Sequence, residues 1–571
     1  MSVNQRDSRR IIVLKFGGSV LARESDIANA VHECYRWVRD GWAVVATVSA
    51  IGDATDRLVS AASFYGHSSS PHAAAALIST GESVSAAHLW LGCDRAGLDA
   101  VAADPREIQL SVTGPADDAI PSGVHAARLR SMLNEHDVVI VPGFFGIDDQ
   151  RRIALLGRGG SDLTAVLLAH ALSARCRLLK DVRGLYERDP SRPGPFARRY
   201  ADVTFHDAAP LAGEILQRKA LAYAERHEVP FEVSALQRRD ATIVGSRWTR
   251  FAEDARENPT RVALLGLGVV GRGVLEHLLR SPRDFAITGV AVQSPKRHAE
   301  AISPRMLTRD AVALAQSEES DVVIEMIGGT GVARTAIEAA LRRGAHVITA
   351  NKSLLAAHGA TLDALAAAHG ATLSYSAAVG GAAPMLEFAA RLHDRGVSSF
   401  ASVLNGTTNC ILGACAQGAA FEDALANAQA LGYAESDPTA DLSGLDAAEK
   451  LRLLCRIAFG RDPDALEVEG LDPRATYSPH DRLVARARRH GKQLTASVRL
   501  ERLEDGHPLL DAIDAGNVAL FTTLDGELHL ARGRGAGRYP TAEAVFADLL
   551  QIRRNQFSVT ADLNALVGGA A

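Results

Sequence analysis

The sequence predicts an α/β protein built from two successive halves, each with a mainly parallel sheet covered by helices. Strand-like apolar runs alternate with helical patterns from Ile11 onward, and a second strand, glycine turn and helix begin at Arg261. Between the halves, the stretch F-A-E-D-A-R-E-N-P-T is polar and contains a proline, which predicts a boundary there. A chain of 571 residues has room for about four domains.

The composition argues against several classes of protein. Hydrophobic residues make up 47% of the chain and charged residues 23%, so extended disorder is not expected. The formal net charge is -5 and no long basic block occurs, which argues against a nucleic-acid-binding protein. No apolar run reaches the roughly 18 residues of a membrane span, and the first residues lack the apolar core of a signal peptide. We therefore expect a cytoplasmic protein that does not bind membranes.

Lysine is rare in this chain, so each lysine is a candidate functional residue. Of 62 lysine and arginine residues only seven are lysine: Lys15, Lys180, Lys219, Lys296, Lys352, Lys450 and Lys492. An ammonium group can release its proton, whereas a guanidinium group stays charged. The six cysteines are scattered without a C-x-x-C pair, so we expect reduced thiols.

A glycine turn follows the first expected strand. In K-F-G-G-S (15–19), backbone N–H groups and an ammonium could bind an anion, although a simple tight turn has the same pattern. Four segments follow in order: V-S-A-I-G-D-A-T-D-R (48–57), S-T-G-E-S-V-S (79–85), G-R-G-G-S-D-L-T-A (157–165) and K-D-V-R-G-L-Y-E-R-D-P (180–190). Together these segments resemble aspartate kinase, a member of the amino-acid kinase family, over residues 11–247.

The resemblance implies transfer of the γ-phosphate of ATP to the side-chain carboxylate of aspartate, with Mg²⁺ bridging the nucleotide phosphates. The residues implied at the phosphates are Lys15, Asp162, which would hold the lysine, and the amides of Gly17, Gly18 and Gly160. Those implied at aspartate are Arg158 for a carboxylate, Glu82 for the ammonium, and Ser49, Thr55 and Ser161. The loop implied for adenosine contains Lys180, Asp181 and Tyr186. Ser49 and Thr55 could also be helix caps or turn residues.

Two positions depart from the kinase pattern, and both concern ATP. Where the family carries a G-A-K-V-L-H-P-R-like segment, this chain reads A-G-E-I-L-Q-R-K-A, so Glu214 replaces an expected lysine and Arg218 or Lys219 would have to supply the charge. The arginine of D-P-S-R also comes one residue later than in D-P-R. Two alternatives stay open: a non-catalytic sensing or scaffold domain, and a kinase for another carboxylate such as acetylglutamate, against which Arg158 and Glu82 argue.

The second half opens with a dinucleotide-binding pattern. The segment G-L-G-V-V-G lies between an expected strand and a helix and contains Gly266, Gly268, Val269, Val270 and Gly271. The next expected strand, I-T-G-V-A-V, ends without an acid for a ribose 2′-hydroxyl, and Lys296 and Arg297 follow it. This favours NADP over NAD, although a solvated basic turn would have the same sequence.

Several later segments of the second half form a pattern that is specific enough to compare with a known family. In chain order they are D-V-V-I-E-M-I-G-G (321–329), H-V-I-T-A-N-K-S-L-L-A (346–356), A-A-V-G-G-A-A-P-M (377–385), N-G-T-T-N (405–409), L-G-Y-A-E-S-D-P-T-A-D-L-S-G-L-D-A-A-E-K (431–450) and G-R-G-A-G-R-Y-P-T-A (533–542). This set resembles homoserine dehydrogenase over essentially all of residues 261–571. The resemblance implies reduction of aspartate 4-semialdehyde to homoserine by NADPH.

Asp446 and Lys450 lie four residues apart in a helical pattern, so their side chains share one face, as they would in an ordinary surface ion pair. By the resemblance, Lys450 is the proton donor and Lys352 is a second cation near the carbonyl and the nicotinamide. The resemblance also implies that Glu435 and Asp446 bind the substrate and that Asp441 supports the lysine. Further implied residues are Ile327 and Thr330 beside the cofactor, and the carbonyls of Val379, Gly381 and Ala383 around a structural Na⁺.

The expected architecture is an amino-acid-kinase-type αβα sandwich, then a Rossmann dinucleotide-binding domain with an α+β catalytic domain. The expected ranges are 10–247 (kinase-like domain), 248–260 (linker), 261–392 (NADP-binding domain), 393–540 (catalytic domain) and 541–571 (a segment returning to the nucleotide-binding domain). Such a fusion would catalyse the first and third steps from aspartate to homoserine and would need a separate aspartate-semialdehyde dehydrogenase. We expect a homo-oligomer without the small ACT domains that bind regulatory threonine or lysine.

Overall fold

The computed structural model describes residues 9–66, 70–190, 197–211, 215–253, 258–379, 381, 383–431, 433–434, 437–514, 516–534 and 538–567. The chain divides into two compact units. Among the described residues, the N-terminal unit covers 9–253 and the C-terminal unit covers 258–567. All six cysteines are free thiols. None of the described helices combines the length and the hydropathy that a bilayer crossing needs.

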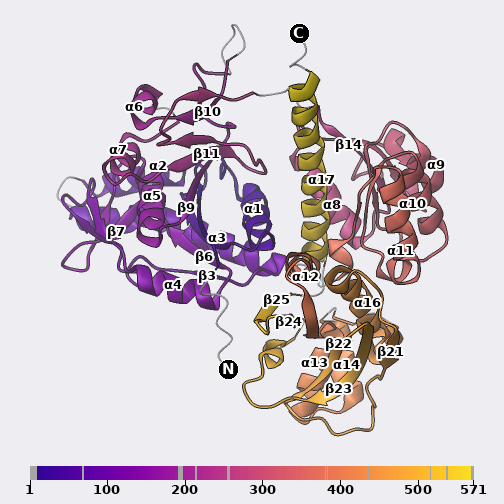
Figure 1. Ribbon diagram of the computed structural model, residues 1–571. Helices are drawn as coiled ribbons and strands as arrows, with labels where there is room; N and C mark the ends of the chain where they lie inside the picture. The colour runs from indigo at the N-terminus through magenta and orange to yellow at the C-terminus, as the bar shows by residue number, and fades with distance from the viewer. Residues whose placement is uncertain are drawn as a thin grey trace. The chain divides into compact units, whose positions relative to one another are not determined.

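A large sheet forms the centre of the N-terminal unit (Figure 1). Among the described residues its strand order is β13-β10-β12-β11-β9-β1-β2-β6-β3. The bounds are β1 (Ile11–Phe16), β2 (Ala43–Val48), β3 (Ala100–Ala102), β6 (Val138–Pro142), β9 (Arg175–Lys180), β10 (Tyr200–Val203), β11 (Phe231–Ala235), β12 (Thr242–Val244) and β13 (Arg250–Phe251). The strands from β11 to β3 are parallel, so the carboxyl ends of β1, β2 and β9 meet at one edge. β13 lies in the stretch expected as a linker and pairs with β10.

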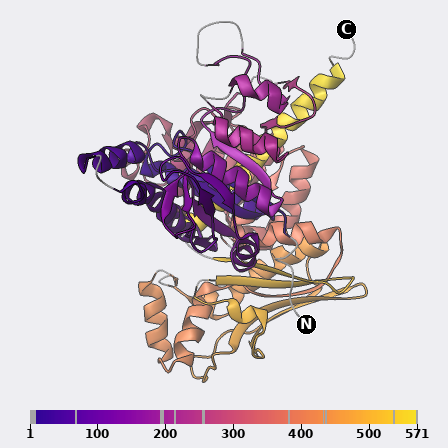
Figure 2. The same cartoon turned by 90° about the vertical axis from the view of Figure 1, so that its left-hand side faces the viewer.

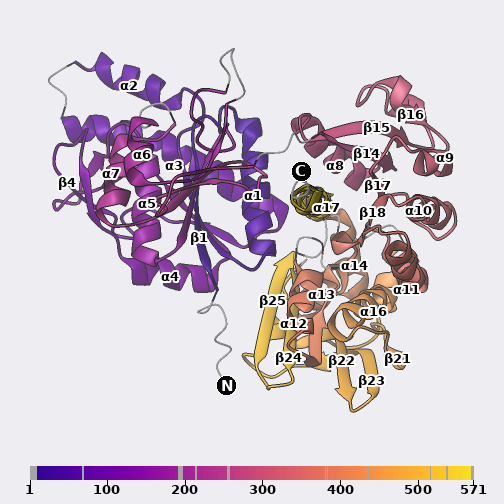
Figure 3. The same cartoon turned by 45° about the horizontal axis from the view of Figure 1, so that its top comes forward.

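Helices cover both faces of this sheet (Figure 3). α1 (Ile27–Arg39) packs with α3 (Pro71–Ala96) on one face, and α4 (Ala126–Glu135), α5 (Gly160–Leu172) and α7 (Arg218–Arg226) pack on the other. Because side chains alternate along a strand, Val13 joins the core with α4, α5 and α7, whereas the equally buried Ile12 and Leu14 face the opposite layer.

Smaller elements complete the N-terminal unit. A second sheet has the strand order β5-β4-β7-β8. These smaller elements are β4 (Ser111–Thr113), β5 (Ile120–Gly123), β7 (Phe145–Ile147), β8 (Ile153–Leu155), α2 (Ala54–Phe64), α6 (Phe205–Ala208) and the 3-10 turns Glu24–Asp26 and Ala209–Leu211.

The C-terminal unit begins with a fully parallel sheet of order β16-β15-β14-β17-β18-β19. Counted along the chain this order is 3-2-1-4-5-6, which is the order of dinucleotide-binding sheets. Its strands are β14 (Thr260–Leu265), β15 (Phe285–Ala291), β16 (Leu307–Thr308), β17 (Val322–Glu325), β18 (His346–Thr349) and β19 (Leu373–Ser374). Its helical segments are α8 (Val269–Arg280), α9 (Ala311–Gln316), α10 (Val332–Arg342), α11 (Lys352–Ala368) and the 3-10 turns Pro295–Arg297 and Pro304–Met306.

A second sheet of order β21-β23-β22-β20-β24-β25 follows, and its long strands run side by side in Figure 2. Its strands are β20 (Val397–Val403), β21 (Ala465–Val468), β22 (Asp481–His490), β23 (Gln493–Arg502), β24 (Gly516–Thr523) and β25 (Leu528–Arg534). The helical segments are α12 (Met385–His393), α13 (Gly406–Ala416), α14 (Phe421–Ala430), α15 (Thr439–Leu442), α16 (Leu445–Phe459) and the 3-10 turns Ser376–Ala378 and Pro508–Asp511. The helices α12, α13, α14 and α16 share one apolar core with this sheet.

The last helix, α17 (Arg538–Val567), packs against α8 of the nucleotide-binding sheet (Figure 1). The His277 ring stacks on Phe546 with centroids 4.7 Å apart, and His277 Nε2 lies 3.1 Å from Glu543 Oε1. Arg553 Nη1 donates to Thr260 Oγ1 at 3.0 Å. Both units therefore have the α/β fold class that the sequence predicts.

Candidate active sites

The predicted catalytic side chains of the C-terminal unit meet at the starts of two helices. Asp446 lies in the first turn of α16, and Lys450 Nζ is 2.7 Å from its Oδ2. Lys352 is the first residue of α11, and its Nζ pairs with the other carboxylate oxygen, Oδ1. Asp446 is 2% exposed. One buried carboxylate therefore lies between two ammonium groups from different helices.

Ion pairing outweighs burial in this cluster. Burial would raise the pKa of Asp446, but Lys450 and Lys352 hold the pKa of this carboxyl well below its usual range. Burial would likewise lower the pKa of Lys352, but the charge and hydrogen bond of Asp446 raise the pKa of this ammonium above its ordinary value. Asp446 is therefore an anion and Lys352 a cation at neutral pH.

Two side chains without a predicted role hold the acids in place. Asn405 Nδ2 donates to Asp441 Oδ1 at 2.6 Å and to Asp446 Oδ2 at 2.8 Å. The Thr407 hydroxyl lies 2.5 Å from the Tyr433 carbonyl oxygen and 3.1 Å from Asp441 Oδ2, and its single hydrogen can be donated to either acceptor. Both residues belong to the N-G-T-T-N segment, which carried the resemblance but has no spacing that assigns a role. This was the only available signal for them.

The two lysines differ in access. The Lys450 side chain is 13% exposed, and its Nζ donates to the Leu404 carbonyl at 2.7 Å. The Lys352 side chain is 38% exposed, so it lies on the open side of the cluster. Glu435, predicted to bind substrate, lies outside the described residues.

The glycine turn after β14 has the close approaches that a dinucleotide site requires. Gly266 has φ +101, and a Cβ there would lie 2.6 Å from the Met326 carbonyl oxygen. A Cβ on Gly271 would lie 2.5 Å from the Gly266 oxygen, whereas one on Gly268 would meet nothing within 4 Å. The open space at Gly268 and the adjoining start of α8, where Val269 and Val270 lie, fit a pyrophosphate.

A buried glutamate, which sequence reasoning missed, shapes the neighbouring turn. Glu325 ends β17, and its Oε1 accepts from the backbone N–H groups of Ile327 at 2.7 Å and Gly328 at 3.0 Å. Its Oε2 accepts from Thr349 Oγ1 at 2.5 Å. Ile327 and Thr330, predicted beside the cofactor, lie exposed at this edge. An acid at the end of the D-V-V-I-E segment is equally typical of a solvated strand end, so the sequence pattern did not predict that Glu325 is buried.

The other predicted ligand positions of the C-terminal unit are also described. Lys296 and Arg297 are exposed in the 3-10 turn that follows β15. Val379, Gly381 and Ala383 are buried between β19 and α12, and the Ala383 carbonyl already accepts from Met385 N at 2.7 Å. A carbonyl oxygen has a second lone pair, so this hydrogen bond does not prevent the Ala383 carbonyl from binding a cation.

The N-terminal unit contains a second aspartate between two lysines. Lys15 Nζ, at the end of β1, lies 2.6 Å from Asp162 Oδ1, and Lys180 Nζ, at the end of β9, lies 2.8 Å from Asp162 Oδ2. Asp162 lies in the first turn of α5 and is 1% exposed. The parallel strands therefore bring together three residues that the sequence predicted at the phosphates and the adenosine.

Burial and ion pairing prevail at different groups of this second cluster. Burial lowers the pKa of Lys15 despite the opposing charge of Asp162, whereas Lys15 and Lys180 hold the pKa of the buried Asp162 below its ordinary value. Glu82, on α3, accepts from the Ala50 N–H at 3.2 Å through Oε1, and its Oε2 is buried without a hydrogen-bond partner among the described residues. Burial raises the pKa of Glu82 to about 7. An incoming ammonium group would satisfy this carboxylate.

The glycine segments of the N-terminal unit leave room near the lysine. A Cβ on Gly17 would lie 2.9 Å from Lys15 Nζ, whereas one on Gly18 would meet nothing within 4 Å. Gly160 begins α5. This arrangement fits a phosphate group beside Lys15. Among the described residues, no three His, Cys, Asp or Glu side chains group as metal ligands, so Mg²⁺ would depend on nucleotide oxygens and water.

The remaining predicted substrate residues lie around this edge. Ser49 follows β2 and donates its N–H to the Phe16 carbonyl at 3.0 Å, and Thr55 is in the first turn of α2. Ser161 is the second residue of α5, and Arg158 is exposed in the turn before it.

A lysine lies close to the glycine turn 157–160. Lys219 Nζ donates to the Leu156 carbonyl at 3.0 Å and pairs with Asp118, and a Cβ on Gly157 would lie 3.1 Å from this Nζ. Glu214 lies outside the described residues. Lys219 therefore places an ammonium group, paired with Asp118, beside the glycine turn.

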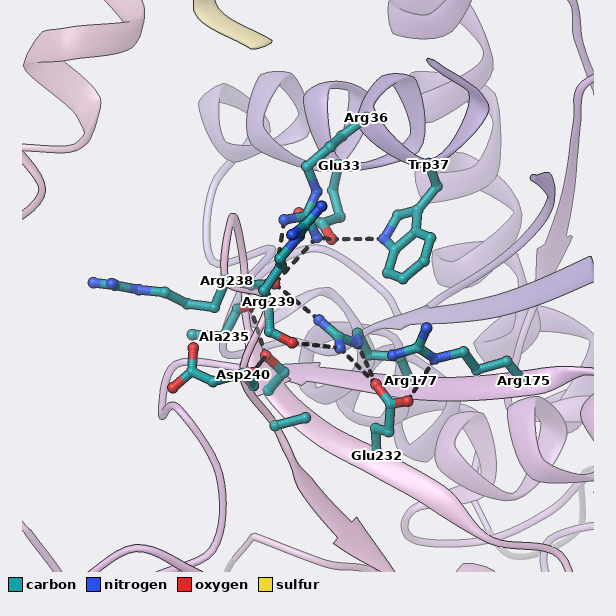
Figure 4. A network of polar contacts seen from close by, with 12 residues as sticks. Glu33, Arg36, Trp37, Arg175, Arg177, Glu232, Ala235, Arg238, Arg239 and Asp240 are labelled. Carbon is teal, nitrogen blue, oxygen red and sulfur yellow. Dashed lines mark hydrogen bonds and ion pairs between the residues drawn. The ribbon is translucent and has the colours of Figure 1, made fainter. Parts of the chain in front are cut away.

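A buried ion network supports the loop predicted for adenosine (Figure 4). Arg177, 1% exposed, donates from Nε to Glu232 Oε2 at 2.7 Å and from its two terminal nitrogens to the carbonyls of Arg238 and Arg239, each at 2.9 Å. In the same turn, Glu33 Oε2 accepts from Gln237 N at 2.9 Å. These contacts fix the turn between β11 and β12.

The turn between β11 and β12 is hydrogen-bonded to the segment that contains Asp181 and Tyr186. Arg183 Nη2 donates to Asp240 Oδ2 at 2.7 Å, and Leu185 N donates to Thr242 Oγ1 at 2.9 Å. The network is thus a structural support for the nucleotide edge, and no sequence pattern indicated it.

Comparison with known proteins gives three matching family models. Amino acid kinase family matches residues 10–232, the NAD-binding domain of homoserine dehydrogenase matches 266–376, and homoserine dehydrogenase matches 384–550. These matches confirm the predicted fusion of a kinase-family domain with a dehydrogenase.

Individual relatives match the C-terminal unit. The homoserine dehydrogenase of Corynebacterium glutamicum is 38% identical over 326 residues, which cover 52% of this chain and 72% of that protein. The Bacillus subtilis enzyme is 34% identical over 336 residues, covering 54% and 76%. A crystal structure of a homoserine dehydrogenase from Thiobacillus denitrificans matches with a TM-score of 0.49 and 34% identity, covering 52% and 74%. The chain therefore belongs to the homoserine dehydrogenase family and carries an amino acid kinase family domain ahead of the dehydrogenase.

Proposed function

We propose that the C-terminal unit reduces L-aspartate 4-semialdehyde to L-homoserine with NADPH, and that Asp446, Lys352 and Lys450 form its reaction centre. The observation that carries this assignment is the buried carboxylate of Asp446 between two ammonium groups. A carbonyl that gains a hydride becomes an alkoxide, which needs nearby positive charge and then a proton.

The side chains divide this work. Lys450, enclosed and held by the Leu404 carbonyl, donates the proton to the alkoxide oxygen. The more exposed Lys352 stabilises the developing negative charge at the carbonyl side. Asp446 and Glu435 bind the polar groups of the substrate, and Asp441 supports the lysine. NADPH, when bound along the Gly266–Gly271 turn, would supply the hydride, and the backbone carbonyls of Val379, Gly381 and Ala383 would hold a structural Na⁺.

A substitution at the central acid tests the assignment. Asp446→Asn keeps the shape of the side chain but removes the charge between the lysines, so kcat/KM for NADP-dependent homoserine oxidation should fall at least about 100-fold. Glu467→Gln, which removes a 65% exposed surface carboxylate, is the matched control and should keep wild-type activity. Equal activity of the two variants would exclude Asp446 from the reaction centre.

We also propose that the N-terminal unit is an active aspartate kinase. Lys15, Asp162 and Lys180 carry the assignment, since their summed charge is positive and buried where a phosphate fits. Glu82 accepts the ammonium of aspartate, Arg158 takes a carboxylate, and the hydroxyl groups of Ser49, Thr55 and Ser161 complete the substrate cradle. ATP with Mg²⁺ supplies the phosphoryl group, and Lys219 contributes the cation that the Glu214 segment lacks.

An ATP-dependent hydroxamate assay distinguishes this proposal from its alternatives. Aspartate should give product, and acetylglutamate, which has no free ammonium for Glu82, should not. Product with acetylglutamate alone would indicate the other kinase, and no product with either would indicate a sensing or scaffold domain. An active kinase would release an acyl phosphate, so a separate reductive enzyme must convert it into the semialdehyde.

A further inference from the structure

We propose that Asn405 is a positioning residue of the dehydrogenase, which sets the geometry of Asp441 and Asp446 through a single side-chain amide. This inference rests on the proposed roles of the two acids. The Asn405 amide donates one hydrogen bond to each carboxylate, at 2.6 Å and 2.8 Å. Among the described residues, no other side chain is hydrogen-bonded to both Asp441 and Asp446.

The orientation of this amide is fixed from the other side. Asn405 is the N-cap of α13, and its Oδ1 accepts from the Thr408 N–H at 2.8 Å. Because the oxygen must accept from that N–H, the NH₂ group must face the acids. The side chain is 4% exposed, so water offers little substitute for either contact. The helix start thus aims two N–H donors at two carboxylates.

The charges around the amide explain why it is needed. Asp441 and Asp446 are both acids, and two carboxylates that approach each other without a donor between them repel. Asp446 Oδ2 receives both Asn405 and Lys450, which leaves Oδ1 to Lys352. Asn405 therefore decides which oxygen faces which lysine.

The preceding residue extends the same arrangement. The Leu404 carbonyl accepts from Lys450 Nζ at 2.7 Å. Residues 404 and 405 together therefore hold the proposed proton donor and both acids, and a shift of this helix start would move all three. Asn405 itself has no proposed contact with the reacting atoms, so its effect is indirect.

Asn405→Ser tests the proposal. Serine also caps helices well, so the variant keeps the cap but loses the NH₂ group. A buried hydrogen bond to a charged group is lost at each acid, so kcat/KM for homoserine oxidation should fall about 10- to 100-fold in protein that remains folded at the assay temperature. Asp310→Ala, which removes the N-cap of α9 in the nucleotide-binding sheet, should lower stability and leave kcat/KM unchanged.

Asn405→Asp supplies a second readout. The new carboxylate can still cap α13, but it places a third anion between the acids and donates a hydrogen bond only when protonated. Its activity deficit should therefore narrow as the pH falls from about 8 to about 6, whereas the Asn405→Ser deficit should stay constant. A merely structural role would give both variants the wild-type pH profile.

Two outcomes overturn the inference if all variants fold, and a third applies if Asn405→Ser does not fold. One is wild-type kcat/KM in Asn405→Ser while Asp446→Asn is inactive, which leaves the proposed function intact but removes Asn405 from it. The other is full activity in Asp446→Asn, which removes the acids themselves. If Asn405→Ser does not fold, a pH-independent deficit in the nearly isosteric Asn405→Asp contradicts the proposal.

Discussion

The two units contain the same set of three charged groups, but the electrostatic surroundings of the two sets differ. Each has a buried aspartate between two lysines: Asp162 with Lys15 and Lys180, and Asp446 with Lys352 and Lys450. In the first cluster burial outweighs the ion pair at Lys15, whose pKa lies below its ordinary value. In the second the surrounding acids dominate and the pKa of Lys352 lies above its ordinary value.

The difference lies in what surrounds each aspartate. Asp162 has only lysines as charged hydrogen-bonding partners among the described residues, so its cluster is positive when the neighbouring Glu82, whose pKa is raised to about 7, is protonated. Asp446 is tied through Asn405 to a second acid, Asp441, which cancels that excess. A positive cluster favours a phosphate, and a balanced one favours a zwitterionic amino acid. Neighbouring acids, and not the shared triad, thus separate the two chemistries.

Single lysine substitutions should separate the two activities, and this is the largest effect we expect. Lys15→Ala removes the ammonium beside the proposed phosphate site, so aspartate phosphorylation should fall at least about 100-fold while homoserine oxidation is kept. Lys450→Ala removes the proton donor and should give the reverse pattern, with a loss of about 100- to 10,000-fold. Both assays are run on each purified variant.

The control for this pair is Lys492→Ala, which removes an exposed lysine in the turn between β22 and β23 and should keep both activities. A folded variant that loses both activities at once would contradict independent reaction centres.

The second-largest effect we expect is a change of cofactor preference when Lys296 and Arg297 are replaced. Lys296 and Arg297 are exposed after β15, where the 2′-phosphate of NADP would lie. A charge-assisted contact contributes about 1.5–3 kcal/mol, so the enzyme should prefer NADP over NAD by roughly 10- to 100-fold in kcat/KM. The double variant Lys296→Ala/Arg297→Ala should lose this preference while its activity with NAD, the internal control, stays the same. Equal kcat/KM for the two cofactors in the wild-type protein would refute the assignment.

These comparisons also show what sequence can predict. The α16 pair of Asp446 and Lys450 followed from helical spacing, because local geometry fixes residues four apart. The contact of Lys352 with Asp446 joins two helices, so spacing alone could not predict it and only the resemblance suggested it. Both glycine turns follow strands as expected, because the strand–turn–helix pattern is local.

The supporting roles of Arg177 and Asn405 could not be predicted from the sequence, for a different reason. Arg177 is fully buried, but in an arginine-rich chain it cannot be told from solvated arginines, and its carbonyl partners come from a turn distant in sequence. Asn405 is recognisable as a helix cap, yet its second role depends on the fold bringing α15 and α16 to it. Supports of this kind are set by tertiary packing.

A smaller effect should appear in the pH dependence of the kinase. The pKa of Glu82 is raised to about 7, so the carboxylate that would bind the aspartate ammonium is lost as the pH falls through 7. The KM for aspartate should then rise up to about tenfold between pH 8 and pH 6. Glu82→Gln should raise KM at pH 8 and bring little further change at pH 6, where the wild-type group is already neutral. A wild-type KM that is independent of pH across this range would contradict the role of Glu82.

The smallest effect should come from added threonine or lysine. An allosteric inhibitor acts through a second site that binds it differently in two states of the protein. Between β13, which closes the N-terminal sheet at Phe251, and β14, which starts at Thr260, the described residues form no helix or strand, and the interval is too short for a β-α-β-β-α-β module. We therefore expect both activities of this chain to change less than about twofold at millimolar threonine or lysine, apart from weak competition by substrate resemblance. Initial rates of both reactions are measured against increasing effector at fixed substrate, with homoserine itself as the positive control for product inhibition. Cooperative inhibition at sub-millimolar effector would reveal a regulatory site within the two units and would break the independence on which their comparison rests.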